Sequence, residues 1–118
     1  MTDKKTHYLK VLNIELQDLL EDIDLRAVTQ KTRLEQGGIT EYVYRENIAL
    51  LTSERRALER FLEELGRFDP SPYIDVKELE GEIEKKFILF LEEHEFPHAI
   101  EGFVTRKMKK VLQFCQCD

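Results

Sequence analysis

Two apolar stripes of matched length, separated by the pair Gly37-Gly38, constrain this chain more than any other feature of its sequence. Their members recur every three or four residues, a spacing that places side chains on one face of an α-helix. The first stripe is Leu9, Leu12, Leu16, Leu19 and Ile23, and the second is Ile48, Leu51, Leu58, Leu62 and Leu65. Because paired glycines between two such stripes are typical of a chain reversal, the pattern predicts a long antiparallel helical hairpin.

The ends of these two helices carry local signals. The first helix is expected over about residues 6–35 and the second over about 41–65. The Thr40 hydroxyl is placed to accept from a free N–H of the first turn of the second helix. Gly66 is expected to end that helix in the left-handed conformation, and the prolines that follow prevent its continuation.

The apolar stripe of the first helix weakens toward the tip of the hairpin. After Ile23 the inward positions of the first helix become polar, which predicts that its last turns lack a full partner and project into solvent. A β-ribbon is the alternative for this tip, because residues 28–32 and 39–44 are rich in β-formers and Gly-Gly suits a hairpin turn. Helix is favoured, since an isolated two-stranded ribbon is only marginally stable.

A second, shorter hairpin is expected after the Pro-containing linker of residues 67–74. Its helices are predicted over about 76–94 and 97–115. Asp75 and Glu78 form a capping-box pattern at the start of the first, and Pro97 suits the first position of the second because it has no N–H to leave unpaired. The prediction is an all-α fold, a four-helix, bundle-like array in one domain over residues 1–118.

The composition of the chain limits the classes of binding partner and the cellular location that we expect for it. With 24 acidic and 18 basic residues the formal net charge is −6, which disfavours nucleic acid and anionic membranes. No apolar run reaches the length of a membrane span, and the N-terminus does not resemble a signal peptide. The cysteines Cys115 and Cys117 are too close in sequence to build a disulfide framework, so a cytoplasmic location is expected. Cys115 is expected to act as an apolar residue and Cys117 as a terminal thiol.

The string His94-Glu95-Phe96-Pro97-His98 matches the H-E-x-x-H pattern of zinc enzymes. That chemistry needs one continuous helix so that both imidazoles share a face. Pro97 interrupts such a helix, so no catalytic, cofactor or metal site is expected, and an enzyme is not predicted. A metal-binding protein or metalloenzyme that uses this segment remains the first alternative.

The segment Arg106-Lys-Met-Lys-Lys110 is the single basic cluster. We expect it to pair with the glutamate-rich helix that precedes it, with Met108 in the core. A nucleic-acid-binding module built on this cluster is the second alternative.

The favoured function is a small protein–protein interaction module, an adaptor or regulator that acts through self-association, most simply a homodimer, or through a helical partner. The hairpin offers more apolar surface than one helix covers. The expected interaction surface combines aromatic, aliphatic and arginine side chains, as protein interfaces do. Its members are Tyr42, Tyr44, Arg45, Leu50 and Phe61.

Overall fold

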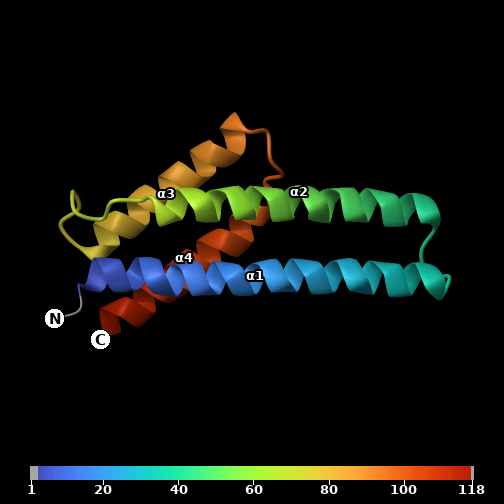
Figure 1. Cartoon of the computed structure of the whole chain (residues 1–118), viewed down its shortest axis with the longest axis horizontal. Coiled ribbons are helices and arrows are strands. Elements are labelled where there is room, and N and C mark those ends of the chain that lie inside the picture. The colour runs from blue at the N-terminus through green and yellow to red at the C-terminus, as the bar shows by residue number, and fades with distance from the viewer. Residues whose placement is uncertain (1–2, 118) are drawn as a thin grey trace.

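The computed structural model describes residues 3–117 and contains four helices, with no strand among these residues. They are α1 (Lys4–Glu35), α2 (Glu41–Gly66), α3 (Val76–Glu93) and α4 (Ala99–Cys117). α1 and α2 run antiparallel along the longest dimension of the molecule, which is 55 Å, and α3 and α4 cross one half of this hairpin (Figure 1). The predicted all-α, four-helix array is confirmed, and the helical tip is found instead of the β-ribbon.

The local signals at the helix ends explain most of these boundaries. The Thr40 hydroxyl accepts from the N–H of Val43 at 3.2 Å, and the Asp75 carboxylate accepts from the N–H of Glu78 at 2.9 Å. Gly37 has φ +74°, the left-handed conformation that lets the chain reverse after α1. These helix ends are therefore set by interactions that the sequence encodes locally.

The left-handed conformation predicted for Gly66 and the start predicted for the last helix are wrong. Gly66 is the last residue of α2 and has no positive φ; the helix ends instead through i to i+3 bonds from the N–H groups of Arg67 and Phe68. α4 begins at Ala99, two residues after Pro97. The Phe96 N–H donates to the Leu91 carbonyl at 3.0 Å, and this bond holds the chain in a turn at the position where the helix was expected to begin.

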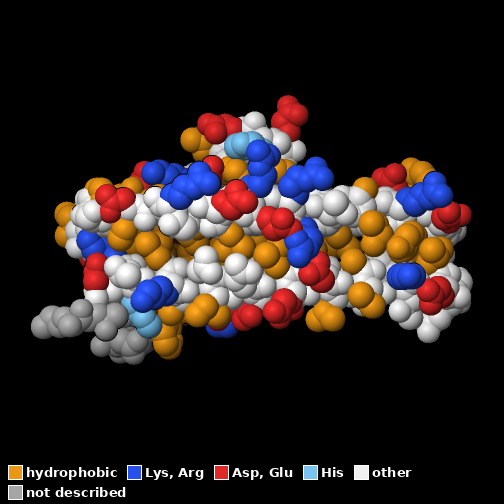
Figure 2. All heavy atoms as spheres, viewed as in Figure 1, with side chains coloured by type: hydrophobic (Ala, Val, Ile, Leu, Met, Phe, Trp, Pro, Cys, Tyr) orange, Lys and Arg blue, Asp and Glu red, His pale blue; other side chains and the backbone are white. Residues whose placement is uncertain are grey.

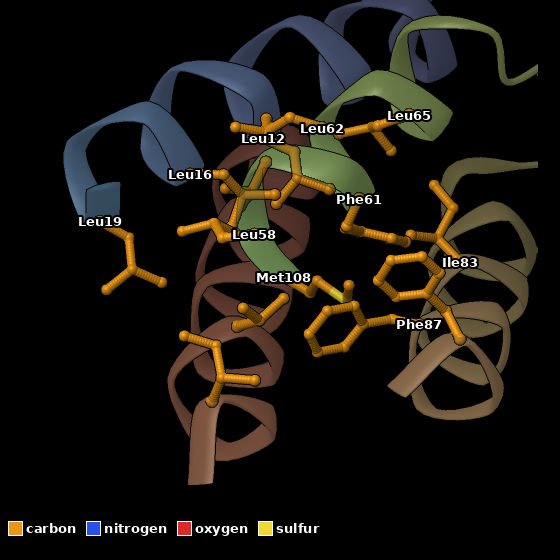
Figure 3. Packing of buried hydrophobic residues seen from close by; sticks show 14 of the residues in the cluster. Leu12, Leu16, Leu19, Leu58, Phe61, Leu62, Leu65, Ile83, Phe87 and Met108 are labelled. Atoms are coloured by element: carbon orange, nitrogen blue, oxygen red, sulfur yellow. The ribbon is translucent and has the colours of Figure 1, made fainter. Parts of the chain in front are cut away.

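The core lies where α3 and α4 cover the hairpin, and we term this half the body. Figure 3 shows leucines of α1 and α2 meeting Met108 of α4 and Phe87 of α3. The Phe61 ring of α2 lies 4.6 Å from that of Phe87 and 5.9 Å from that of Phe90. α3 and α4 therefore supply the second layer that the apolar face of the long hairpin needs.

Candidate interaction surface

Over residues 24–53 the hairpin projects past the body, with contact to α4 at its base through Arg26 and Phe103, and we term this part the arm. None of its residues is buried, whereas α1 and α2 each contribute several buried residues on the body side. The arm forms the end of the molecule where only two helices are present (Figure 1). A pair of helices without a further layer has only one seam in which to bury apolar side chains.

That seam is partly polar. Ala27 and Leu34 of α1 and Ile48 and Leu51 of α2 are half-buried. Between them the Asn47 side-chain amide donates to the Gln30 side-chain oxygen at 2.7 Å. The pair fixes the register of the two helices but adds little apolar burial, so the arm is held together more weakly than the body.

Large apolar side chains remain exposed on the arm. Figure 2 shows hydrophobic side chains along the boundary of α1 and α2 and gathered over the arm. The exposed residues and their exposed fractions are Leu25 65%, Val28 63%, Tyr42 73%, Val43 40% and Leu50 46%. Since two of these residues lie on α1 and three lie on α2, both helices offer apolar surface to a partner.

Val43 and Leu50 have a specific position on α2. They are seven residues apart, and seven further residues lead to Ala57, which is fully buried in the body. The same face of α2 is therefore covered by the rest of the chain in the body and uncovered in the arm. Val43 was not among the predicted surface residues, although its spacing from Leu50 and Ala57 is the signal that would have identified it.

The structure separates the five predicted surface residues. Tyr42, Arg45 and Leu50 are exposed, and Arg45 forms an ion pair with Glu41 at 2.7 Å. Tyr44 is half-buried and lies on the seam side of α2. Phe61 is 3% exposed inside the aromatic cluster of the body, so its assignment to the surface is wrong: α3 covers the face that the sequence left open.

The charge of the arm differs from that of the body. Residues 24–53 contain four acidic and four basic side chains, so the whole excess of −6 belongs to the rest of the chain. The acidic members are Asp24, Glu35, Glu41 and Glu46, and the basic members are Arg26, Lys31, Arg33 and Arg45. A neutral surface with both signs interspersed can approach a copy of itself without net repulsion.

The base of the arm is a charged junction. The Arg55 guanidinium binds Asp24 at 2.8 Å and also contacts Glu59, and the hydrogen bond from Arg55 lowers the pKa of Asp24. Glu54, the next residue along α2 from the arm, is 4% exposed. Burial raises the pKa of its carboxyl, while nearby Arg26 acts in the opposite direction.

The His94–His98 segment is not helical. α3 ends at Glu93, and Glu95 has φ +54°, so the two histidines lie on a turn between helices. His94 Nδ1 lies 3.0 Å from the Phe90 carbonyl oxygen, and His98 Nδ1 lies 3.7 Å from a Glu101 carboxylate oxygen. Within the described residues no three His, Cys, Asp or Glu side chains are grouped to hold a metal ion.

Of the two cysteines, Cys115 is buried in the core, as expected for an apolar residue. The side chain of Cys117 lies outside the described part of the chain.

The basic cluster of α4 divides between two neighbours, and its expected pairing with α3 is only partly found. Lys107 and Lys110 approach Glu15 of α1 at 3.0 and 3.8 Å, and the bond from Lys107 lowers the pKa of that carboxyl. Lys109 instead acts on Glu80 of α3. Met108 is fully buried between the two sides, as predicted.

No described helix is both long enough and apolar enough to cross a membrane. Comparison of the chain with models of known protein families, with curated protein sequences and with solved structures found no match.

Proposed function

We propose that this chain is a protein–protein interaction module that forms a homodimer through its arm. The observation that carries the proposal is the contrast along α2: one face is covered by α3 in the body and exposes Val43 and Leu50 in the arm. A second copy that lays its own arm on this face would continue the two-layer packing of the body.

The distribution of charge favours an antiparallel arrangement of the two arms. Each body carries the full formal net charge of −6, while each arm has no net charge. Two-fold symmetry with antiparallel arms brings the neutral surfaces together and keeps the two acidic bodies at opposite ends of the dimer. The arm of about twelve residues per helix is roughly 18 Å long. Such a short contact belongs to the small class of interfaces, so the expected dissociation constant is micromolar.

Substitution of an exposed arm residue tests the proposal. Leu50→Lys places a charge in the contact, whereas Leu89→Lys makes the same change at an exposed position of α3 outside the arm. Both sites are solvent-exposed in the single chain, so neither substitution is expected to alter folding by more than about 0.5 kcal/mol.

Size-exclusion chromatography with light scattering reads out the result. At concentrations well above the expected micromolar dissociation constant, we expect the wild-type chain and Leu89→Lys to approach twice the chain mass of 14.0 kDa, and Leu50→Lys to remain at 14.0 kDa. A wild-type chain that stays at the monomer mass, or equal dissociation of both variants, would overturn the proposal.

A further inference from the structure

A basic cavity lies between α1 and α4 at the base of the arm. Its volume is about 280 Å³, close to the lower end of small-ligand sites. Four cationic side chains line it, with one carboxylate, that of Asp22, among the lining residues described. The cations are Arg26, Arg106, Lys107 and Lys110. The lining of the cavity is therefore positively charged, although the chain as a whole has a net charge of −6.

Two of these cations are held in place by one aromatic ring. The Arg26 guanidinium lies 4.7 Å from the centre of the Phe103 ring, and that of Arg106 lies 5.2 Å from the same centre. Arg106 is further fixed by its Nε, which donates to the Gly102 carbonyl at 3.1 Å. Stacking on a ring engages the flat face of a guanidinium and leaves its N–H edge for an anion.

The two lysines complete the site from α4. Lys107 and Lys110 share a single carboxylate, that of Glu15. The two arginines, which belong to different helices, are brought together by Phe103 although their charges repel each other. A multiply charged anion between them relieves this repulsion and offers the planar N–H forks more acceptor oxygens than a carboxylate has.

We propose that this cavity binds a small compound through its phosphate group. The phosphate accepts from Arg26 and Arg106 and is neutralised by the two lysines. Phosphate suits the site because it combines two negative charges with a tetrahedral set of oxygens that arginine forks recognise. A small compound is favoured over nucleic acid because the acidic remainder of the chain repels an extended polyanion.

Titration of the full chain with inorganic phosphate and with pyrophosphate, followed by NMR chemical shifts, tests the site. We expect saturable shifts confined to the cavity residues of α1 and α4, with pyrophosphate the tighter of the two. Arg106→Gln should weaken binding by about tenfold, the factor typical of losing one charge-assisted contact. Arg60→Gln, which removes the same charge from an exposed position of α2, should leave the affinity within about twofold.

A third variant separates a built site from a diffuse positive patch. Phe103→Leu keeps every charge but removes the ring that holds both guanidinium groups, and it should weaken binding severalfold while the circular dichroism spectrum stays that of the wild type. The proposal is overturned if no saturable shift occurs, if Arg60→Gln weakens binding as much as Arg106→Gln, if Phe103→Leu binds like the wild type, or if short single-stranded DNA binds at these residues while both phosphates do not.

Discussion

Tyr8 and Glu80 carry polar groups into the core where α1 and α3 meet. The Tyr8 hydroxyl and one carboxylate oxygen of Glu80 are buried without a hydrogen-bond partner within the part of the chain that the structure describes. Burial, reinforced by Glu80, Cys115 and Glu84, raises the pKa of Tyr8. Burial also raises the pKa of Glu80 to about 7, aided by Glu84 and opposed by Lys109.

This raised pKa predicts a stability that falls with pH. Folding favours the neutral Glu80 carboxyl, so its contribution is complete below the ordinary pKa of 4.5 and is lost as pH rises through about 7. Glu80→Gln should therefore match the wild type near pH 4.5 and exceed its free energy of unfolding by up to about 3 kcal/mol at pH 8.

Urea denaturation at both pH values measures the difference. Glu92→Gln, at an exposed position of the same helix, is the matched control and should show no such gain. A Glu80→Gln variant that is no more stable than the wild type at pH 8 would show that the carboxyl does not titrate in a buried setting.

The sequence does not reveal that the Glu80 carboxyl is buried. Glu80 directly follows Leu79 in the glutamate-rich helix that was expected to pair with the basic cluster of residues 106–110. Its 7% exposure depends on how α1 and α4 cross α3. Periodicity gives the direction of a side chain around its own helix but not the rotation of that helix against its neighbours.

At the scale of single elements, local chemistry is a good guide. Thr40 and Asp75 cap α2 and α3 as predicted, because a capping interaction involves only residues within one turn. The beginning of α4 was predicted less well. That beginning depends on the turn that contains Phe96. The Phe96 ring is buried, and its centre lies 5.7 Å from the centre of the Phe90 ring of α3. Such a contact between separate elements is not visible in the local sequence.

The reversal between α1 and α2 yields a paired glycine test. Gly37 has a positive φ and open space around it, so Gly37→Ala introduces backbone strain without a clash and should lower the free energy of unfolding by about 1 kcal/mol. Gly81 lies inside α3 with equally open space around it. Because alanine favours a helix more than glycine does, Gly81→Ala should raise the free energy of unfolding by about 1 kcal/mol.

Thermal unfolding of the two variants beside the wild type measures both changes. Opposite shifts of the melting temperature are expected. If Gly37→Ala melts at or above the wild-type temperature, the left-handed turn is not required for the hairpin.

At the scale of the whole molecule, the two stripes predicted the long hairpin, and the weakening of the first stripe after Ile23 predicted its projecting tip. The sequence could not determine which part of the hairpin the second pair of helices covers. Phe61 was grouped with Leu50 in one interaction surface, but the second pair of helices buries Phe61 and leaves Leu50 exposed. The linker of residues 67–74 permits several placements, and packing in the core selects one.

Small-angle X-ray scattering of the wild-type chain tests arm-to-arm association most directly, because it reports particle mass and maximum dimension together. Antiparallel arms that overlap by roughly 18 Å join two chains of 55 Å into a dimer. The expected result at high concentration is twice the mass of 14.0 kDa with a maximum dimension of about 90 Å. A particle of the monomer mass, or a dimer no longer than the single chain, would contradict association through the arm.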